Sequence, residues 1–335
     1  MDLIPVLYDP QAMLPTDMIF YEQIIGDIEF FGVSAQAYYL LQQGGKLAKA
    51  PSFFQERLKL SYMEALYLNI FISKQTEQLL NLLESRGIDV IPLKGTIFAE
   101  KYFGHLGARP TSDIDILIHK SDLEKSIECV KVLGYTCEHA FIPDHFHCSF
   151  SKTLPGSHIP LTVELHWDLL KSNTSNLQIN EFWDQAKPIK PFRHIMELSD
   201  YHTFYMICLH GWRHNLGSLK YFIDIIQLIH TLGDMIDYTA LLKDAASHKT
   251  SKRLIRTLSI VYKQFPHLAH IKPFPFQKST LWWEYRAIKK DYGKSLKTYM
   301  DFIDYQFLSY DSVKHSLIEL SSWFSKLKKP PFPRA

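Results

Sequence analysis

The segment 91–118, IPLKGTIFAEKYFGHLGARPTSDIDILI, ends in an alternating run that contains two aspartates. Successive side chains of a β-strand point to opposite faces, so Asp113 and Asp115 share one face and the isoleucines around them share the other. A strand that buries its isoleucine face places both carboxylates side by side at an accessible edge. Two such carboxylates repel each other unless a cation lies between them, and oxygen ligands of this kind suit Mg²⁺ or Mn²⁺.

An Asp-x-Asp pattern taken alone is more often a solvated strand end or a turn, but the residues before it favour a site. Residues 90–93 predict a short buried strand, and a turn follows at Lys94, Gly95 and Thr96. Thr96 is a candidate cap for a helix over residues 97–103. Gly95 lets a phosphate approach the backbone, the helix start offers free N–H groups, and Lys94 adds a positive charge.

A third acidic residue occurs in the alternating segment 161–167, LTVELHW. Its Thr162, Glu164 and His166 face one way, and its apolar residues face the other. Glu164 can therefore supply a third carboxylate beside the aspartate pair.

These three motifs together, LKGT at 93–96, RPTSDIDILI at 109–118 and VELHW at 163–167, resemble the nucleotidyltransferase superfamily, in its poorly characterised branch with a Leu-Lys-Gly opening. The superfamily includes polymerase-beta-like enzymes, antibiotic nucleotidyltransferases and toxin nucleotidyltransferases. The resemblance covers residues 88–170 directly and continues weakly to about residue 230. Lys94-Gly95-Thr96 stands where the superfamily usually has a Gly-Ser turn.

The resemblance implies a metal-dependent transfer of a nucleoside monophosphate from an NTP, expected to be ATP, to an acceptor. Asp113 and Asp115 are expected to hold Mg²⁺, or Mn²⁺, with Glu164 completing the second metal site or acting as a base. Each of these three residues is thus both a catalytic and a metal-binding candidate.

Nucleotide-binding candidates come from the residues around the aspartates. Lys94, Gly95 and Thr96 are expected to hold the β and γ phosphates, and Ser112 to cap the backbone or bond a phosphate. Arg109 either neutralises the leaving pyrophosphate or is only a surface loop arginine.

Second-tier candidates are His166, His210 and Asp224. A His-rich helix followed by a helix with a single Asp recurs in the family that the chain resembles, which points to His210 and Asp224. His145 and His147 fall on one face of a predicted strand, but a pair without an obvious third ligand is weak evidence for zinc, so we interpret them as polar strand residues near the acceptor.

Composition favours a packed globular protein, because 46% of the 335 residues are hydrophobic. A net charge of +2 does not favour a broad nucleic-acid surface, although a local basic groove stays open. The four cysteines fit no disulfide framework and are typical of reduced thiols, which favours a cytoplasmic protein. Neither a signal peptide nor an apolar stretch long enough for a membrane span is expected.

The fold expected is α+β, with a small mixed β-sheet nucleotidyltransferase core at 88–170 between helical regions at 1–87 and 171–335. Helices are predicted at 18–31, at 34–43, at 51–86 as two helices, at 121–133 with Ser121 and Glu124 as a capping box, at 198–214, at 219–232 and through 238–328. Strands are predicted at 135–140, 145–152 and 163–167, with a hairpin turn at 154–157 and a polar connector at 171–192.

The sequence does not identify the acceptor, and a small molecule or a peptide side chain is favoured over RNA. Two alternatives remain: a toxin-like nucleotidyltransferase that acts on tRNA ends, and a nucleotide-binding module without turnover. The presence of all three carboxylates counts against the second.

Overall fold

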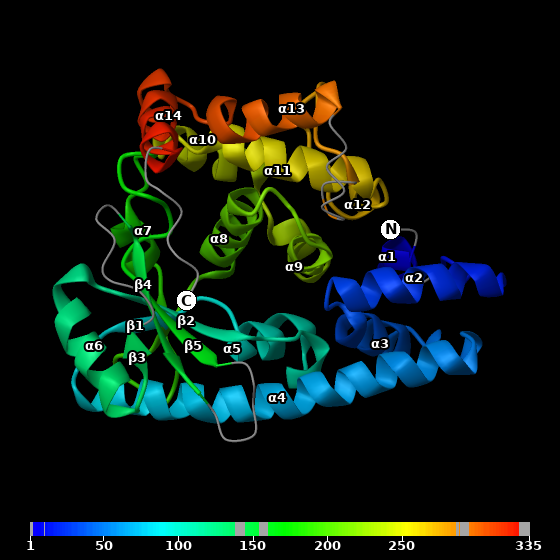
Figure 1. Cartoon of the computed structure of the whole chain (residues 1–335), viewed down its shortest axis with the longest axis horizontal. Coiled ribbons are helices and arrows are strands. Elements are labelled where there is room, and N and C mark those ends of the chain that lie inside the picture. Colours follow the sequence, from blue (N-terminus) through cyan, green and yellow to red (C-terminus); the bar gives the residue numbers. More distant parts are fainter. Residues whose placement is uncertain are drawn as a thin grey trace.

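The computed structural model describes residues 3–9, 11–137, 145–153, 160–285, 288 and 295–327. It shows the predicted α+β fold, in which a five-stranded mixed sheet lies between helices from both ends of the chain (Figure 1). Within the described residues, no helix is both long and apolar enough to cross a membrane.

The N-terminal region is helical, with α1 Leu3–Tyr8, α2 Met18–Phe30, α3 Ser34–Gln43 and α4 Ser52–Ser85. The prediction of two helices over 51–86 is wrong, because α4 is one helix of 34 residues. No glycine or proline occurs within it, so nothing in the sequence breaks its hydrogen-bond ladder. It runs along one side of the whole molecule (Figure 1).

The sheet has the strand order β1-β2-β5-β4-β3, formed by β1 Val90–Pro92, β2 Asp113–Ile118, β3 Thr136–Cys137, β4 His147–Lys152 and β5 Leu161–His166. β2 pairs with β5 in parallel, and the other neighbouring strands pair antiparallel. Residues 138–140 of a predicted strand and the predicted turn at 154–157 lie outside the described residues.

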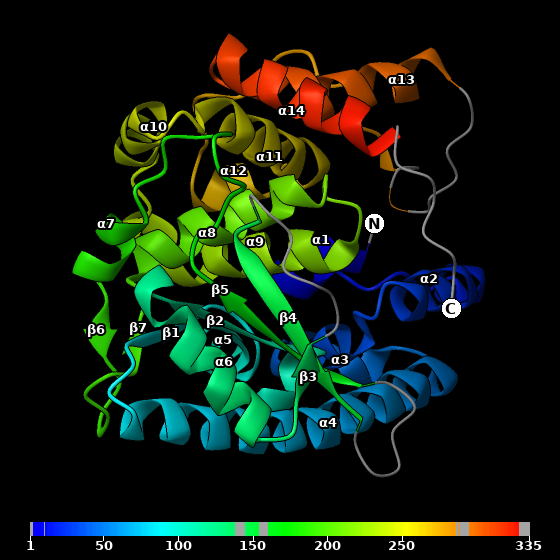
Figure 2. The same ribbon diagram turned by 60° about the vertical axis from the view of Figure 1, so that its left-hand side comes forward.

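Each face of the sheet packs on different helices. The isoleucines of β2 join Val163 and Leu165 of β5 in a core that also contains apolar residues of α4 and of α6 Leu123–Val132. The opposite face turns toward α8 Asp200–Arg213 and α9 Leu219–Leu232 (Figures 1 and 2). The alternation in β2 therefore separates an apolar face from the face that carries Asp113 and Asp115.

The start of α6 differs from the prediction. A short 3-10 helix, Lys120–Asp122, precedes α6. The N-cap residue of α6 is Asp122, which makes no side-chain capping bond. The expected capping box of Ser121 and Glu124 is therefore wrong, because the 3-10 turn moves the cap by one residue.

The connector at 171–192 contains a short helix and one strand of a two-stranded sheet, α7 Ile179–Asp184 and β6 Lys187–Pro188. The second strand of that sheet, β7 Met196–Glu197, follows the connector. The described part of the chain after β7 is mainly helical, with α8, α9, α10 Tyr238–Ser247, α11 Ser251–Gln264, α12 Leu268–Ile271, α13 Leu296–Ile303 and α14 Val313–Leu327. The helix α9 has the predicted bounds.

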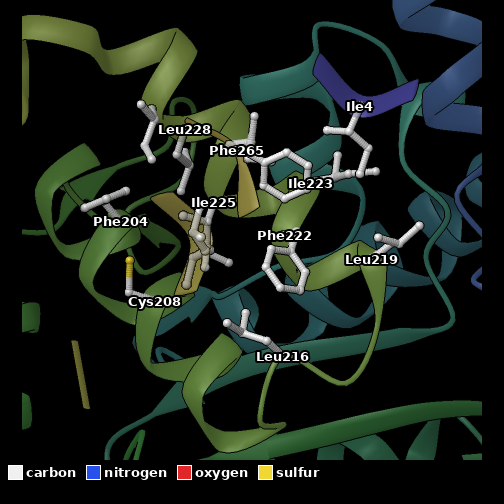
Figure 3. Packing of buried hydrophobic residues seen from close by; sticks show 14 of the residues in the cluster. Ile4, Phe204, Cys208, Leu216, Leu219, Phe222, Ile223, Ile225, Leu228 and Phe265 are labelled. Carbon is white, nitrogen blue, oxygen red and sulfur yellow. The ribbon is translucent and has the colours of Figure 1, made fainter. Parts of the chain in front are cut away.

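The core of this C-terminal region packs around α8 and α9. Figure 3 shows it through Phe204 and Cys208 of α8, the turn residue Leu216, and the apolar side of α9 with Phe222 and its neighbours. Each large apolar side chain that is fully buried contributes roughly 1.5–3 kcal/mol. This packing fixes α8 and α9 in place opposite the face of the sheet that carries the carboxylates.

One buried side chain of α4 holds the chain that leads into β2. Asn69 is fully buried, and its Nδ2 donates to the carbonyl of Leu106 and to the carbonyl of Arg109 at 2.8 Å. Its Oδ1 accepts from the N–H of Thr111 at 3.0 Å. These bonds satisfy backbone groups of an irregular segment that has no strand partner, so Asn69 fixes the approach to Asp113.

We expect Asn69→Leu to lower the free energy of unfolding by roughly 2–5 kcal/mol, because it leaves buried backbone groups without partners. Chemical denaturation monitored by circular dichroism measures this loss. Asn81→Leu is the matched control, since Asn81 is exposed on the same helix. Similar small losses in the two variants would show that Asn69 does not hold the segment.

Candidate active site

The parallel pairing of β2 and β5 brings the predicted carboxylates together. Asp115 lies directly opposite Glu164, Asp113 opposite Thr162, and Leu117 opposite His166. Residues opposite each other in register point to the same face. Two of the three predicted carboxylates therefore stand side by side, with Asp113 two residues earlier on the same face.

Asp115 is not at an accessible edge, contrary to the expectation. Its side chain is only 1% exposed, and each carboxylate oxygen faces a different cationic group. Lys94 Nζ lies 3.0 Å from Oδ2, and His166 Nε2 lies 3.1 Å from Oδ1. The sheet and α8 cover Asp115, whereas Asp113 at the start of β2 is half-buried.

The protonation of this group follows from burial and pairing. Burial alone would raise the pKa of Asp115, but Lys94 and the hydrogen bond with His166 outweigh it and hold this pKa well below its usual range. Burial would lower the pKa of His166, but its two carboxylate partners raise it above the ordinary value. Asp115 is therefore ionised at neutral pH, and its charge favours the protonated form of His166.

Glu164 is tied to Asp115 through the same imidazole. His166 Nε2 lies 3.1 Å from Glu164 Oε2, the same distance as from Asp115 Oδ1. Burial raises the pKa of Glu164, but the hydrogen bond with His166 lowers it, and the net shift is downward. His166, a second-tier candidate, thus occupies the centre of the site.

The predicted phosphate turn has the geometry that requires glycine. Gly95 has φ 79° and ψ −142°, a conformation that side-chain-bearing residues rarely adopt. Gly95 is also the N-cap of the short helix α5 Thr96–Phe98, so the expected cap at Thr96 is wrong. Thr96 is instead the first helical residue and is buried.

Arg109 and Asp224, two of the predicted site residues, form an ion pair with each other. Arg109 Nε and Nη2 lie 2.7 and 2.8 Å from the two carboxylate oxygens of Asp224 on α9, and both side chains are almost fully buried. Arg109 is therefore not a surface loop arginine. The bidentate pair joins the segment before β2 to the C-terminal helices. Ser112, between Thr111 and Asp113, is exposed.

Three basic side chains of α8 and α9, those of His210, Arg213 and Lys220, also interact with the carboxylates. Of these three, the sequence analysis indicated only His210. Burial, with Lys94 nearby, holds the pKa of His210 well below its ordinary value, so its imidazole is neutral. Burial lowers the pKa of Arg213, whose charge interacts with Glu164 and Asp115. Burial and the charge of Arg109 lower the pKa of Lys220 to about 8.

Arg213 and Lys220 were missed because nothing in their local sequence marks them. The last turn of a helix often carries a basic residue, and one lysine on a helix face is ordinarily solvated. Only the packing of α8 and α9 over the sheet brings these two side chains toward the carboxylates.

A small cavity of about 30 Å³ lies within this group, lined by Lys94, His166, His210, Arg213 and apolar residues of α8. It has room for an ion or a water molecule, so a nucleotide does not fit inside it. A larger cavity of about 630 Å³ lies among the C-terminal helices, lined by Lys252, Arg256, Lys278, Asp304 and neighbouring residues. None of the predicted site residues lines that larger cavity.

Within the described residues, three metal-ligating side chains converge at the edge of the site. The donor atoms of His147, Glu164 and His166 lie within 4.8 Å of one another. Burial and the nearby His166 lower the pKa of His147 to about 3, so its ring is neutral at pH 7. His145 is not part of this group; its Nδ1 bonds the carbonyl of His147 at 3.1 Å.

Comparisons with known proteins add to this geometry. A family model described as "Uncharacterised nucleotidyltransferase" matches residues 28–266. Among solved structures, the solution structure of the antibiotic-resistance factor ANT(2'')-Ia aligns with a TM-score of 0.34 and 12% identity, covering 59% of this chain and 96% of that one. No curated protein sequence matches the chain.

We expect Asp224→Asn to lower the free energy of unfolding by about 3–5 kcal/mol, because it leaves the charge of Arg109 buried without its partner. Arg57→Met is the matched control, since Arg57 pairs with Glu29 at the surface, where the side chains are 48% and 32% exposed. That exposed pair contributes at most about 1 kcal/mol. Denaturant titration of both variants measures the difference, and equal losses would contradict the buried role.

Proposed function

The chain belongs to the family of uncharacterised nucleotidyltransferases, because the family model matches residues 28–266 of its 335, and we propose that it transfers a nucleoside monophosphate from an NTP, with ATP as the expected donor, to a small molecule or a peptide hydroxyl. The observation that carries the proposal is the placement of Asp115 opposite Glu164 on parallel strands, with Asp113 on the same face.

The carboxylates fit a divalent cation such as Mg²⁺ or Mn²⁺. They present oxygen atoms, the ligands that these ions prefer, and cationic groups already gather on them, since Lys94 Nζ and His166 Nε2 lie at the two oxygens of Asp115. Asp113, Asp115 and Glu164 would hold the metal. When bound, it would neutralise phosphate charge and lower the pKa of an acceptor hydroxyl.

The groups that would bind phosphate lie on both sides of the carboxylates. Gly95 suits a phosphate turn, because its φ of 79° favours glycine and glycine carries no side chain that would keep a phosphate from the backbone. Lys94 stands next to this turn, and Arg213 and Lys220 add charge from the facing helices.

Other residues hold the site in shape. Arg109 uses its Nε and one Nη on Asp224, so any contact with the leaving pyrophosphate falls to its other N–H groups. The same pair positions the segment that leads through Ser112 to Asp113 against α9. Glu164 is the candidate base for the acceptor hydroxyl, because its side chain is 25% exposed whereas that of Asp115 is 1% exposed.

The acceptor separates the proposal from its alternatives. Transfer to tRNA ends would need a basic surface, and a net charge of +2 gives no sign of a broad one. A binding module without turnover would have no use for Asp113, since Lys94 and His166 already neutralise Asp115. The cysteine pattern that favoured reduced thiols leads us to place the enzyme in the cytoplasm.

We expect Asp113→Asn to reduce Mg²⁺-dependent labelling of the acceptor from α-labelled ATP by at least about a hundredfold, with the melting temperature unchanged. The protein is incubated with a cell extract, and the labelled species is followed by chromatography. Asp234→Asn is the control, because the Asp234 side chain is fully exposed.

Asp113 is the sharper test of the two aspartates. Asp115→Asn also breaks the contacts with Lys94 and His166, so we expect it to lower stability as well as activity. Undiminished labelling by Asp113→Asn would contradict metal-assisted transfer at this site.

We expect Lys94→Ala to weaken binding of ATP by about ten- to a hundredfold and of AMP far less, because a charge-assisted contact contributes roughly 1.5–3 kcal/mol. Titration calorimetry with ATP, ADP and AMP at fixed Mg²⁺ measures the losses, and Lys120→Ala, at an exposed position, is the control. Equal losses for the three ligands would mean that Lys94 only neutralises Asp115.

A further inference from the structure

Two histidines and one glutamate meet where β4 and β5 pair. The antiparallel register places His147 directly opposite His166 and Ser149 opposite Glu164. Residues opposite each other have Cβ atoms about 4.5–5.5 Å apart and share a face. The imidazole rings of His147 and His166 accordingly lie 4.8 Å apart between centroids.

The spacing of the donor atoms fits one metal ion. Ligands about 2.1 Å from a tetrahedral metal stand about 3.4 Å apart. Glu164 Oε2 lies 3.1 Å from His166 Nε2 and 3.8 Å from His147 Nε2, on either side of that value. All three donor atoms lie within 4.8 Å of one another.

Burial holds the three donors in place. The side chains of His147, Glu164 and His166 are 10%, 25% and 5% exposed. Because the paired strands β4 and β5 fix where these side chains start, a cation would meet donors that already face one another.

The donor chemistry differs from that of the aspartate pair. Mg²⁺ prefers oxygen ligands, whereas imidazole nitrogen suits zinc and other transition-metal ions. Two imidazoles with one carboxylate form a donor set that catalytic zinc and non-haem iron sites also use. The set leaves at least one coordination position for water or a substrate oxygen.

We propose that His147, Glu164 and His166 bind a transition-metal dication of the zinc class, beside the oxygen site of Asp113 and Asp115. Glu164 and His166 connect the two positions, because His166 Nε2 is 3.1 Å from both Asp115 and Glu164. The site deepens the proposed function, on which its catalytic role rests, by making the metal on the Glu164 side a nitrogen-bound ion and not Mg²⁺.

Metal binding alone, without nucleotide or activity, tests the site. Protein purified without a polyhistidine tag and treated with chelator is titrated with Co²⁺, whose visible absorption reports nitrogen coordination. Calorimetry with Zn²⁺ and with Mg²⁺ gives the affinities. The variants are His147→Gln and Glu164→Gln, with circular dichroism and thermal melting to verify their folding.

Two control variants distinguish metal bound at these three donors from metal bound elsewhere on the protein. His194→Gln removes a histidine that pairs with Asp89 at 2.8 Å beside the edge strand β1, which β2 and β5 separate from β4. Asp113→Asn removes a carboxylate of the oxygen site that is not among the three donors.

We expect one Co²⁺ per chain with absorption typical of nitrogen ligands, and Zn²⁺ binding weakened at least about tenfold by His147→Gln or Glu164→Gln. His194→Gln and Asp113→Asn should leave that binding unchanged. The absence of nitrogen-coordinated Co²⁺ in the wild type, or unchanged Zn²⁺ binding by a folded His147→Gln or Glu164→Gln, would overturn the proposal.

The outcome is independent of the proposed function. Nucleotidyl transfer by a protein that binds no Co²⁺ or Zn²⁺ through His147 in the titrations would reject the nitrogen site and leave the transfer reaction standing. Metal bound through His147 in a protein that labels no acceptor would reject the transfer reaction and leave the metal site standing.

Discussion

The site depends on the buried carboxylate of Asp115. A charge with a side chain 1% exposed would cost several kcal/mol in isolation, and it is tolerated because Lys94 and His166 hold its two oxygens. The three residues come from the turn after β1, from β2 and from β5, so the contacts of one carboxylate fix the relative position of these three segments. A nucleotide or metal that binds there enters a site that is already organised around charge.

Two further contacts connect the helical regions to the segment 106–111, which leads into β2. Asn69 of α4 bonds the backbone of residues 106–111, and Asp224 of α9 pairs with Arg109 within it. The chain just before Asp113 is thus held from both sides of the sheet. The helices that flank the core consequently have a function beyond burial, because they set the geometry of the aspartate that remains half-exposed.

Local pattern was enough to predict some of these features. The alternation in 113–118 predicted which face of β2 is apolar, the Lys94-Gly95-Thr96 sequence predicted a turn, and the apolar stripe of α9 predicted its bounds. Each of these depends only on neighbouring residues and on the period of a strand or helix.

The remaining features depend on contacts between distant residues. Arg109 and Asp224 are 115 residues apart, so their pairing has no local signal. The burial of Asp115 follows from the packing of α8 over β2. The cluster of His147, Glu164 and His166 comes from the register of β4 against β5, which places His147 opposite His166 and Ser149 opposite Glu164. Strand order and register are tertiary properties, and one sequence with no partner strand in view cannot specify them.

The most direct measurement is anomalous diffraction from crystals grown with Mn²⁺ and a non-hydrolysable ATP analogue. We predict a manganese peak bonded to Asp113 and Asp115, with the triphosphate against the turn at Lys94 and Gly95. A nucleotide bound elsewhere, with no metal at the two aspartates, would contradict the proposed nucleotidyl transfer at this site.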